Sequence, residues 1–338
     1  MACGWFPLTD RRGAGLLCSL AALLLAPALV LAQSTPPASD SEIASRALLM
    51  AVEAGRTDLV AFALDNGADI ESRDGRPGRS TALLLAVEKG DHLVVRLLLA
   101  RGADANALTA TGQTPLMVAA DARDDPLMGV ELLGAGAAID AAAADGTTAL
   151  MAAAGRGHEN LVGLLVLNQA RVDAVDDKGR SALLFAAEDG SLESVHTLLD
   201  AGADPKRRAD NGETSLTRAV IGAHTGVVSL LLAAGADVNA PGANGQTPLI
   251  VAVRTGDTAT VNVLLAAGAD VNRTELANGN SALMYAANSG FADLVEILLT
   301  GGADVDATAR DGWTAVQAAE MVGETAIVER LRAAARGG

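Results

Sequence analysis

The sequence predicts an all-α protein in which helix–turn–helix repeats stack side by side as a solenoid. The stretch "LLAAGADVN" occurs at residues 231–239 and again, letter for letter, at 264–272, an offset of 33 residues. A second phrase, "GQTPLMVAA" at 112–120 and "GQTPLIVAV" at 245–253, recurs in the same register. Self-similarity at a fixed period of roughly 20–50 residues is typical of repeat solenoids.

About nine repeats follow one another between residues 42 and 336, and a recurring glycine marks them. Its steps are 33 to 35 residues, and Gln169 takes its place once among Gly67, Gly102, Gly136, Gly202, Gly235, Gly268 and Gly302. A single repeat cannot bury its own apolar face, whereas stacked neighbours can. Because aromatic residues make up only 2% of the chain, the shared core must consist of Leu, Val, Ile and Ala.

The first helix of a repeat can be located within residues 245–272. Thr247 can cap its N-terminus, and Pro248 suits the first helical position, where no backbone N–H is needed. We expect a short helix over Leu249–Arg254. Gly256 then ends it, since glycine adopts the left-handed conformation of a helix stop without strain.

A second helix follows in the same repeat and carries its apolar residues on one side. Val261, Leu264 and Leu265 are spaced i, i+3, i+4, which places them on one helical face. Gly268 stands where this helix must stop in a left-handed conformation. At the equivalent Gln169, a side chain in that conformation should cost about 1 kcal/mol.

These elements together resemble a known family. The pattern "G-x-T-P-L-x-x-A-A…LL-x-x-G-A-D-V-N" is similar to the ankyrin repeat over about residues 42 to 336, with atypical first and last repeats as caps. The resemblance implies two antiparallel helices per repeat with a hairpin-like loop at right angles to them. It also implies a curved stack with a concave groove, and a function as a protein-binding scaffold.

The first 41 residues differ from the rest in composition. Arg11 and Arg12 precede an apolar run, and Val30 and Ala32 fit the −3 and −1 positions of a signal-peptidase site. We therefore expect residues 1–32 to be a signal peptide and the mature chain to be periplasmic or secreted. The alternative is a membrane anchor formed by the uncleaved run, which is long enough to span a bilayer. The Pro- and Ser-rich residues 33–41 read as a disordered linker.

Composition excludes several classes of function for the mature chain. Both cysteines, Cys3 and Cys18, lie in the expected signal peptide, which leaves no disulfide, thiol nucleophile or cysteine metal site. The chain has 25 Lys and Arg and 41 Asp and Glu; without Asp10, Arg11 and Arg12 it keeps 23 and 40, a net charge of −17. Such an acidic protein is a poor ligand for nucleic acid. We expect a monomer with no membrane insertion of the mature chain.

No residues with the spacing of a catalytic, cofactor or metal site stand out, and we expect no enzyme. The four histidines lie at or near the starts of second helices, where a structural or surface role is the default. Phosphate-binding and metalloprotease motifs are absent from the sequence. Aspartates near loop glycines, as at 176–179, lack the EF-hand spacing and fit turn chemistry better.

The resemblance places partner-binding residues at the ends of first helices and just after the loop glycines. The candidates in this register are Trp313, Ile221, Glu88, Lys89, Arg156, Arg180, Glu188, Asp189, Glu213 and Arg254. Ile221 is apolar where the neighbouring repeats have charged or polar residues. Trp313 is either an interface residue or a cover for the C-terminal edge of the core. Phe185 and Tyr285 are expected in the core.

Two functions therefore remain open from the sequence. The first is a non-catalytic scaffold of the cell envelope that engages a partner protein through the groove and loop tips. The second is an inhibitor or immunity-type protein that blocks one enzyme or toxin. The dense basic run Lys206–Arg208 reads as a solvated loop, or alternatively as a contact for an acidic patch of a partner.

Overall fold

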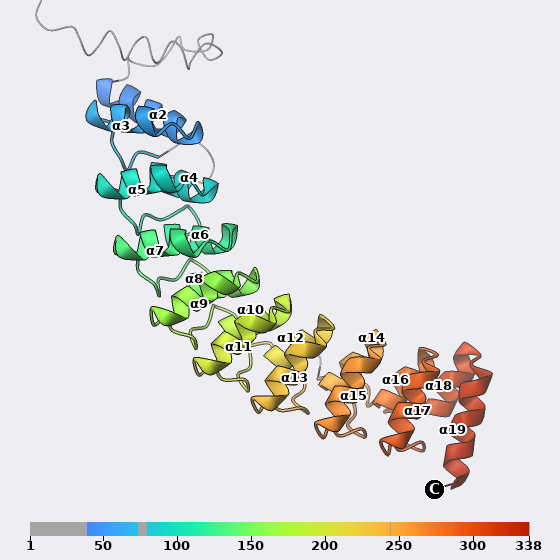
Figure 1. The fold of residues 1–338 in the computed structure, drawn as a ribbon. Helices are drawn as coiled ribbons and strands as arrows, with labels where there is room; N and C mark the ends of the chain where they lie inside the picture. The colour runs from blue at the N-terminus through green and yellow to red at the C-terminus, as the bar shows by residue number, and fades with distance from the viewer. Residues whose placement is uncertain (1–38, 74–79, 244, 338) are drawn as a thin grey trace, which may run out of the picture. The chain divides into compact units, whose positions relative to one another are not determined.

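A computed structural model describes residues 39–73, 80–243 and 245–337 (Figure 1). The expected signal peptide and most of the expected linker lie outside the described residues. The described chain divides into two compact units, the first comprising its residues up to Ala122 together with Leu127–Ala138, and the second Arg123–Pro126 together with the residues from Ile139 onward. We describe each unit by itself.

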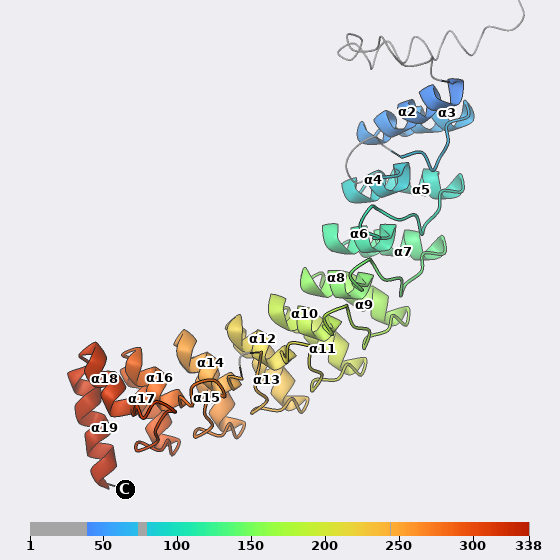
Figure 2. The same cartoon turned by 180° about the vertical axis from the view of Figure 1, so that it is seen from behind.

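Both units are built from helices, and in the described residues only isolated bridges take the place of β-strands, which confirms the predicted all-α fold. In unit 1 the helices are α2 (Asp40–Glu53), α3 (Thr57–Asp65), α4 (Ala82–Lys89), α5 (His92–Ala100), α6 (Pro115–Ala122) and α7 (Pro126–Gly134). In unit 2 they are α8 (Ala149–Gly155), α9 (Glu159–Leu167), α10 (Ala182–Asp189), α11 (Leu192–Asp200), α12 (Ser215–Ile221), α13 (Thr225–Ala233), α14 (Pro248–Thr255), α15 (Thr258–Ala266), α16 (Ala282–Asn288), α17 (Ala292–Thr300), α18 (Ala315–Val322) and α19 (Thr325–Gly337). Within each unit, consecutive helices pair and successive pairs stack (Figures 1 and 2).

The first helix of each pair begins at a hydroxyl cap. In α14, the Thr247 side chain accepts a hydrogen bond from the Ile250 backbone N–H at 3.3 Å, and Pro248 occupies the first turn. Gly256 ends the helix with φ of 75°. The helix extends one residue further at each end than expected. Equivalent caps in unit 2 are Thr148, Ser181, Thr214, Ser281 and Thr314.

The N-terminal helix α2 starts earlier than expected. Ser39 and Glu42 form a capping box, in which each side chain accepts a hydrogen bond from the backbone of the other. This reciprocal arrangement satisfies two N–H groups at the helix start. Asp40 and Ser41, which the sequence analysis assigned to the linker, therefore belong to the helix.

The second helices end as expected, at residues with positive φ. Gly268 has φ of 86°, and Gln169 adopts φ of 65° at the equivalent position after α9. Within the described residues the only other non-glycine residue with positive φ is Ala223 (55°). The left-handed stop is thus a property of the repeat backbone, which Gln169 follows despite its side chain.

The core of each unit lies between its stacked helix pairs. In α14 and α15, the buried side chains include Leu249, Ile250, Val261 and Leu264. Leu265, expected on the same face, is only half-buried. Its side chain instead lies against the neighbouring pair, since a Cβ added at Gly301 would be 3.7 Å from Leu265 Cδ1.

The loops between pairs form closed turns that are linked to one another. In unit 2, antiparallel bridges join Val175 with Ser181, Arg208 with Thr214, and Thr274 with Ser281. Adjacent loops are then connected by backbone hydrogen bonds, such as Asp210 N–H to Lys178 O at 3.0 Å. The loops are therefore fixed extensions of the helical stack. No described helix combines the length and apolar character needed to cross a membrane.

Candidate partner-binding site

Two registers of the repeat form one surface of unit 2, which we call the first-helix face. The loop position is the residue before the hydroxyl cap, and the helix position lies four residues after that cap. Across unit 2 the loop position is occupied by Thr147, Arg180, Glu213, Gln246, Asn280 and Trp313, and the helix position by Ala152, Phe185, Arg218, Val251, Tyr285 and Ala318.

The helix position is the partly exposed side of an otherwise buried helix. In α10, Leu183, Leu184, Ala186 and Ala187 are all buried, whereas Phe185 between them is half-buried. Tyr285 is half-buried in the same way. The expectation that these two rings belong to the core was therefore wrong. A first helix that packs between two neighbouring helix pairs still has one side that faces the loops, and both rings lie on that side.

Arg180 covers the ring of Phe185. Its guanidinium carbon lies 4.5 Å from the ring centroid, within the range of a cation–π interaction. The Arg180 Nε donates to Asp176 Oδ2 at 2.7 Å, and Asp176 Oδ1 accepts from the Arg180 backbone N–H at 2.8 Å. Asp176 thus holds both the loop backbone and the guanidinium in place.

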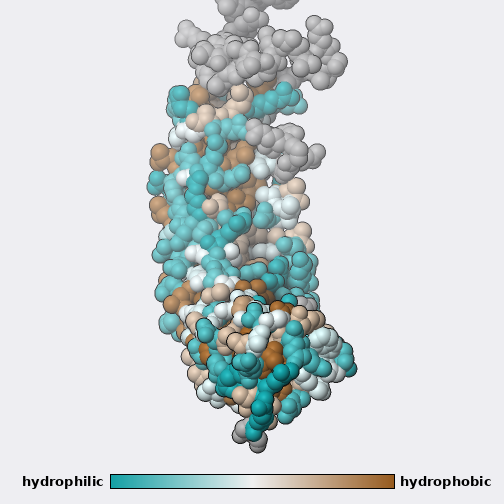
Figure 3. Space-filling view, turned by 90° about the vertical axis from the view of Figure 1, so that its right-hand side faces the viewer, coloured by the Kyte–Doolittle hydropathy of each residue, from teal (hydrophilic) through white to brown (hydrophobic). Residues whose placement is uncertain are grey.

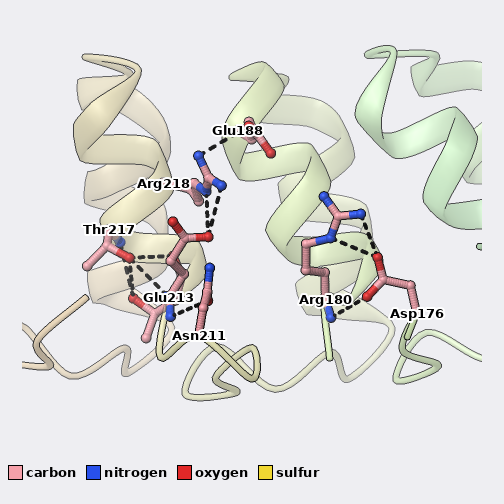
Figure 4. Close-up of polar contacts among 8 residues, drawn as sticks. Asp176, Arg180, Glu188, Asn211, Glu213, Thr217 and Arg218 are labelled. Atoms are coloured by element: carbon pink, nitrogen blue, oxygen red, sulfur yellow. Dashed lines mark hydrogen bonds and ion pairs between the residues drawn. The ribbon is translucent and has the colours of Figure 1, made fainter. Parts of the chain in front are cut away.

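Arg218 joins two neighbouring repeats on the same face (Figure 4). Its Nε donates to Glu213 Oε2 at 3.0 Å, and its Nη1 lies 3.4 Å from Glu188 Oε1 at the end of α10. Glu213 is the more enclosed partner, with 12% of its side chain exposed against 45% for Glu188. The pair with Glu213 should therefore be the stronger of the two.

A third network surrounds Tyr285. Arg254 Nη1 donates to Gln246 Oε1 at 2.8 Å, and Gln246 Nε2 donates to Glu275 Oε1 at 2.9 Å. The hydroxyl of Tyr285 donates to the other oxygen of Glu275 and accepts from Asn278. The guanidinium carbon of Arg254 lies 5.4 Å from the Tyr285 ring centroid. As at Phe185, an arginine lies over an aromatic ring of the face.

Two of these carboxylates are buried at a loop position where the other repeats of unit 2 have small residues. Asp176 and Glu275 are each 6% exposed and stand where the other loops of unit 2 have Ala143, Ala209, Gly242 and Ala309. A buried carboxylate is tolerated only when paired and hydrogen-bonded. Each one has such partners here: Arg180 bonds to Asp176, and Gln246 bonds to Glu275. The need to pair a buried carboxylate accounts for these polar residues at the loop position.

Asp145, in the loop two residues before Thr147, has a clearly lowered pKa. The pKa lies below its ordinary value of 3.8, first because the Thr147 backbone N–H donates to the carboxylate and then through the Thr147 hydroxyl. The charge of Arg180 lowers the pKa further. Hydrogen bonds to the charged form favour ionisation.

Trp313 is the most exposed member of the loop register, at 41%. Its hydrogen bonds are made by its backbone, with N–H donating to Asp311 Oδ1 and the carbonyl accepting from Ala309. With Tyr285, it lines a hollow of about 250 Å³ between α16 and α18.

Ile221, the last residue of α12, is 50% exposed. Ile221 and Trp313 are both exposed; for Trp313 the sequence had left open whether it lies at the surface or covers the C-terminal edge of the core.

The remaining candidates occupy other places in the two units. Lys89 Nζ donates to the Glu53 carbonyl at 2.8 Å, and Glu88 lines a shallow hollow with Gln113; both belong to unit 1. Arg156 is exposed at the end of α8. Asp189 lies against Gly157, where an added Cβ would be 2.5 Å from its Oδ2. A side chain at residue 157 would have to displace the Asp189 carboxylate, and the φ of 64° at Gly157 favours glycine in any case.

The histidines stay apart from one another, although His196 lies inside α11 and not at its start. His92 contacts Glu131 at 3.0 Å in unit 1, and His224 caps α13 in unit 2. Within the described residues, no three or more His, Cys, Asp and Glu side chains are grouped to hold a metal ion.

Sequence reasoning did not identify Arg218 or Glu275, and it assigned Asp176 to turn chemistry without recognising it as the partner of Arg180. A signal for each was present. Arg218 is a charged residue inside the otherwise uncharged helix "SLTRAVI", and Asp176 and Glu275 replace Ala or Gly at a repeat register. Comparison of the repeats with one another, register by register, would have found all three.

The comparisons with known proteins agree with this architecture. The sequence matches the family described as ankyrin repeats (3 copies) over residues 48–133, 123–209, 202–275 and 273–336. No curated protein matches the chain as a whole or in part.

Proposed function

Because the chain belongs to the ankyrin repeat family, whose members are generally scaffolds for protein–protein interaction and typically non-catalytic, we propose that it binds a partner protein through the first-helix face of unit 2. We propose further that it does so without catalysing a reaction. Fold by itself does not establish function, so the proposal is argued from that face.

The observation that carries the proposal is the composition of the first-helix face. Phe185, Arg218, Tyr285 and Trp313 stand on one face, whereas the flanking helix residues are small or buried. Aromatic residues and arginine are enriched at protein interfaces and dominate their binding energy. Ion pairs and hydrogen bonds already hold the polar members in place, so little side-chain entropy would be lost on binding.

The site of action that we propose is the cell envelope. The support is the basic, apolar and cleavable pattern of residues 1–32, which favours export with cleavage after Ala32. N-terminal sequencing of the protein from its native host should yield Gln33 as the first residue. A chain that begins at Met1 in the soluble cytoplasmic fraction would contradict this part of the proposal.

The binding proposal is tested by crosslinking in cells. The full chain is expressed at its native level with a C-terminal tag. The proteins that are captured with it are then compared between wild type and variants. Ile221→Glu places a charge at the end of α12, one helical turn beyond Arg218 of the first-helix face, and Leu192→Glu places one on α11; the two residues are almost equally exposed, at 50% and 51%. We expect one dominant partner that is lost in Ile221→Glu and retained in Leu192→Glu. The absence of an enriched partner, or equal loss in both variants, would contradict binding through this face.

A further inference from the structure

The hollow beside Trp313 is lined by two aromatic rings, two thioethers and a single charge. Its lining residues are Asn280, Met284, Tyr285, Asn288, Asp311, Trp313, Thr314, Ala318 and Met321. Its volume of about 250 Å³ lies below the roughly 300–1,000 Å³ of sites that take drug-sized ligands. The hollow therefore suits one side chain of a partner.

The charge of the hollow points to the kind of side chain. Among the described residues that line it, Asp311 alone is charged at neutral pH, and its carboxylate is exposed. Asp311 Oδ1 accepts the Trp313 backbone N–H at 3.2 Å, which leaves acceptor capacity for an incoming donor. An aromatic surface next to a carboxylate is complementary to a cation.

The rest of the first-helix face shows which cation fits. Phe185 and Tyr285 each have an arginine over the ring, at 4.5 Å and 5.4 Å. The indole of Trp313 has no such arginine from the described part of the chain. The chain thus supplies arginines to two rings of the face and leaves the most exposed ring open to solvent.

Exposed apolar residues lie on the helix that borders the hollow, and one of them, Met321, lines it with Trp313. Met321 and Val322 at the end of α18 are 63% and 44% exposed. Figure 3, which views the molecule from the α19 end, shows hydrophobic patches among hydrophilic side chains at that end of unit 2. Such a surface can cover the aliphatic stem of a long cationic side chain while its charged head meets Asp311.

We propose that this hollow binds an arginine side chain from a basic segment of the partner protein. The guanidinium stacks on Trp313 and bonds to Asp311, which repeats the way in which Arg180 lies over Phe185 and bonds to Asp176. Planarity and five fixed donors make arginine better suited than lysine to this combination. The inference rests on the proposed partner-binding function and names the chemistry that the partner brings.

The test uses the full chain with Trp5→Phe, which leaves Trp313 as its only tryptophan. The probes are nine-residue Gly/Ser peptides with one central arginine, lysine or citrulline, at constant ionic strength. We expect the arginine peptide to change Trp313 fluorescence saturably, with a Kd of about 1–10 mM. The neutral citrulline peptide, nearly the same shape, should bind roughly tenfold more weakly. Equal binding of arginine and citrulline peptides, or no change up to about 20 mM, would overturn the inference.

Two variants connect the signal to the named groups. Asp311→Asn keeps the oxygen that accepts the Trp313 N–H and removes the charge, so the turn should persist while arginine affinity falls about threefold or more. Trp313→Leu, followed by NMR of the peptide, should abolish arginine selectivity at an unchanged unfolding midpoint. Selectivity that survives in both variants would contradict the assignment.

The outcomes separate this inference from the general function. If cells yield a partner that is lost in Ile221→Glu while the arginine and citrulline peptides bind alike, the scaffold function stands and the arginine site fails. If the arginine peptide is selected but no partner is captured, the pocket stands and the proposed function fails.

Discussion

The side-chain Oδ1 of Asn239 accepts a 2.9 Å hydrogen bond from the backbone N–H of Asp270, 31 residues further along the chain. Asn272, at the end of the second copy of the repeated phrase, accepts from the Asp304 N–H at 2.8 Å. The last residue of the phrase therefore connects each loop to the next. Asp140 does the same for the Arg171 N–H.

This link predicts that Asn239→Ala destabilises the protein. The variant leaves the Asp270 N–H without its partner, and the free energy of unfolding should fall by about 0.5–1.5 kcal/mol. Asn239→Asp is the matched control, because Asp140 already shows that a carboxylate accepts at this register. Chemical denaturation of the three proteins measures the difference. Equal losses for Ala and Asp would contradict the hydrogen-bond account.

The left-handed helix stop predicts opposite effects at two equivalent positions. Gln169→Gly should raise the free energy of unfolding by about 1 kcal/mol, because glycine adopts φ of 65° without strain. Gly268→Ala should lower it by a similar amount. A Cβ at Gly268 would have no neighbour within 4 Å, so backbone strain is the only cost. Urea unfolding midpoints at constant slope report both changes. A loss of stability in Gln169→Gly would show that its side chain makes compensating contacts.

The two carboxylates around Arg218 should differ in the strength of their coupling. We expect a double-mutant cycle of Arg218→Met with Glu213→Gln to give about 1 kcal/mol, and the cycle with Glu188→Gln about 0.5 kcal/mol or less. The physical reason is solvent screening, since the Glu213 side chain is 12% exposed and that of Glu188 45%. Unfolding free energies of the single and double variants provide both values. The reverse order would mean that the Glu188 pair is the one shielded from water.

Asp145 predicts a small dependence of stability on pH. Because its pKa is lowered in the folded protein, the ionised carboxylate stabilises the fold above the ordinary value of 3.8. That contribution is lost as the pH falls below 3.8 through the lowered pKa. Relative to Asp145→Asn, the wild type should be more stable at pH 7 by a few tenths of a kcal/mol, about what an exposed group supplies. The difference should disappear in strong acid. A difference that stays constant with pH would contradict the assignment.

The parts of the fold that sequence reasoning predicted depend on short-range chemistry. The cap at Thr247, the proline that follows it and the stop at Gly268 each act within a few residues, and all three were predicted correctly. The early start of α2 was missed, although Ser39 and Glu42 stand at the spacing of a capping box. The error arose because a Pro- and Ser-rich composition was given more weight than that local signal.

The candidate site was predicted less well. The repeat register singled out Trp313 and Ile221, which are both exposed, but left open whether Trp313 covers the edge of the core. The ion pairs of Arg180 and Arg218 were not predicted, and Phe185 was assigned to the core. The helix position is occupied by Ala, Phe, Arg, Val or Tyr in different repeats. The hydropathy of the residue alone therefore does not indicate how much of it the neighbouring loop covers.

The sequence by itself determined the repeat, the all-α fold and the family, because hydroxyl caps, glycine stops and helical periodicity act locally and recur at a fixed spacing. Only the tertiary structure decided which side chains meet across repeats. The contacts of Arg218 with Glu188 and of Asn239 with Asp270 join residues about thirty positions apart in the chain. Stacking brings such residues together, and the geometry of each loop then determines whether an arginine bonds to a carboxylate, covers an aromatic ring or leaves that ring open.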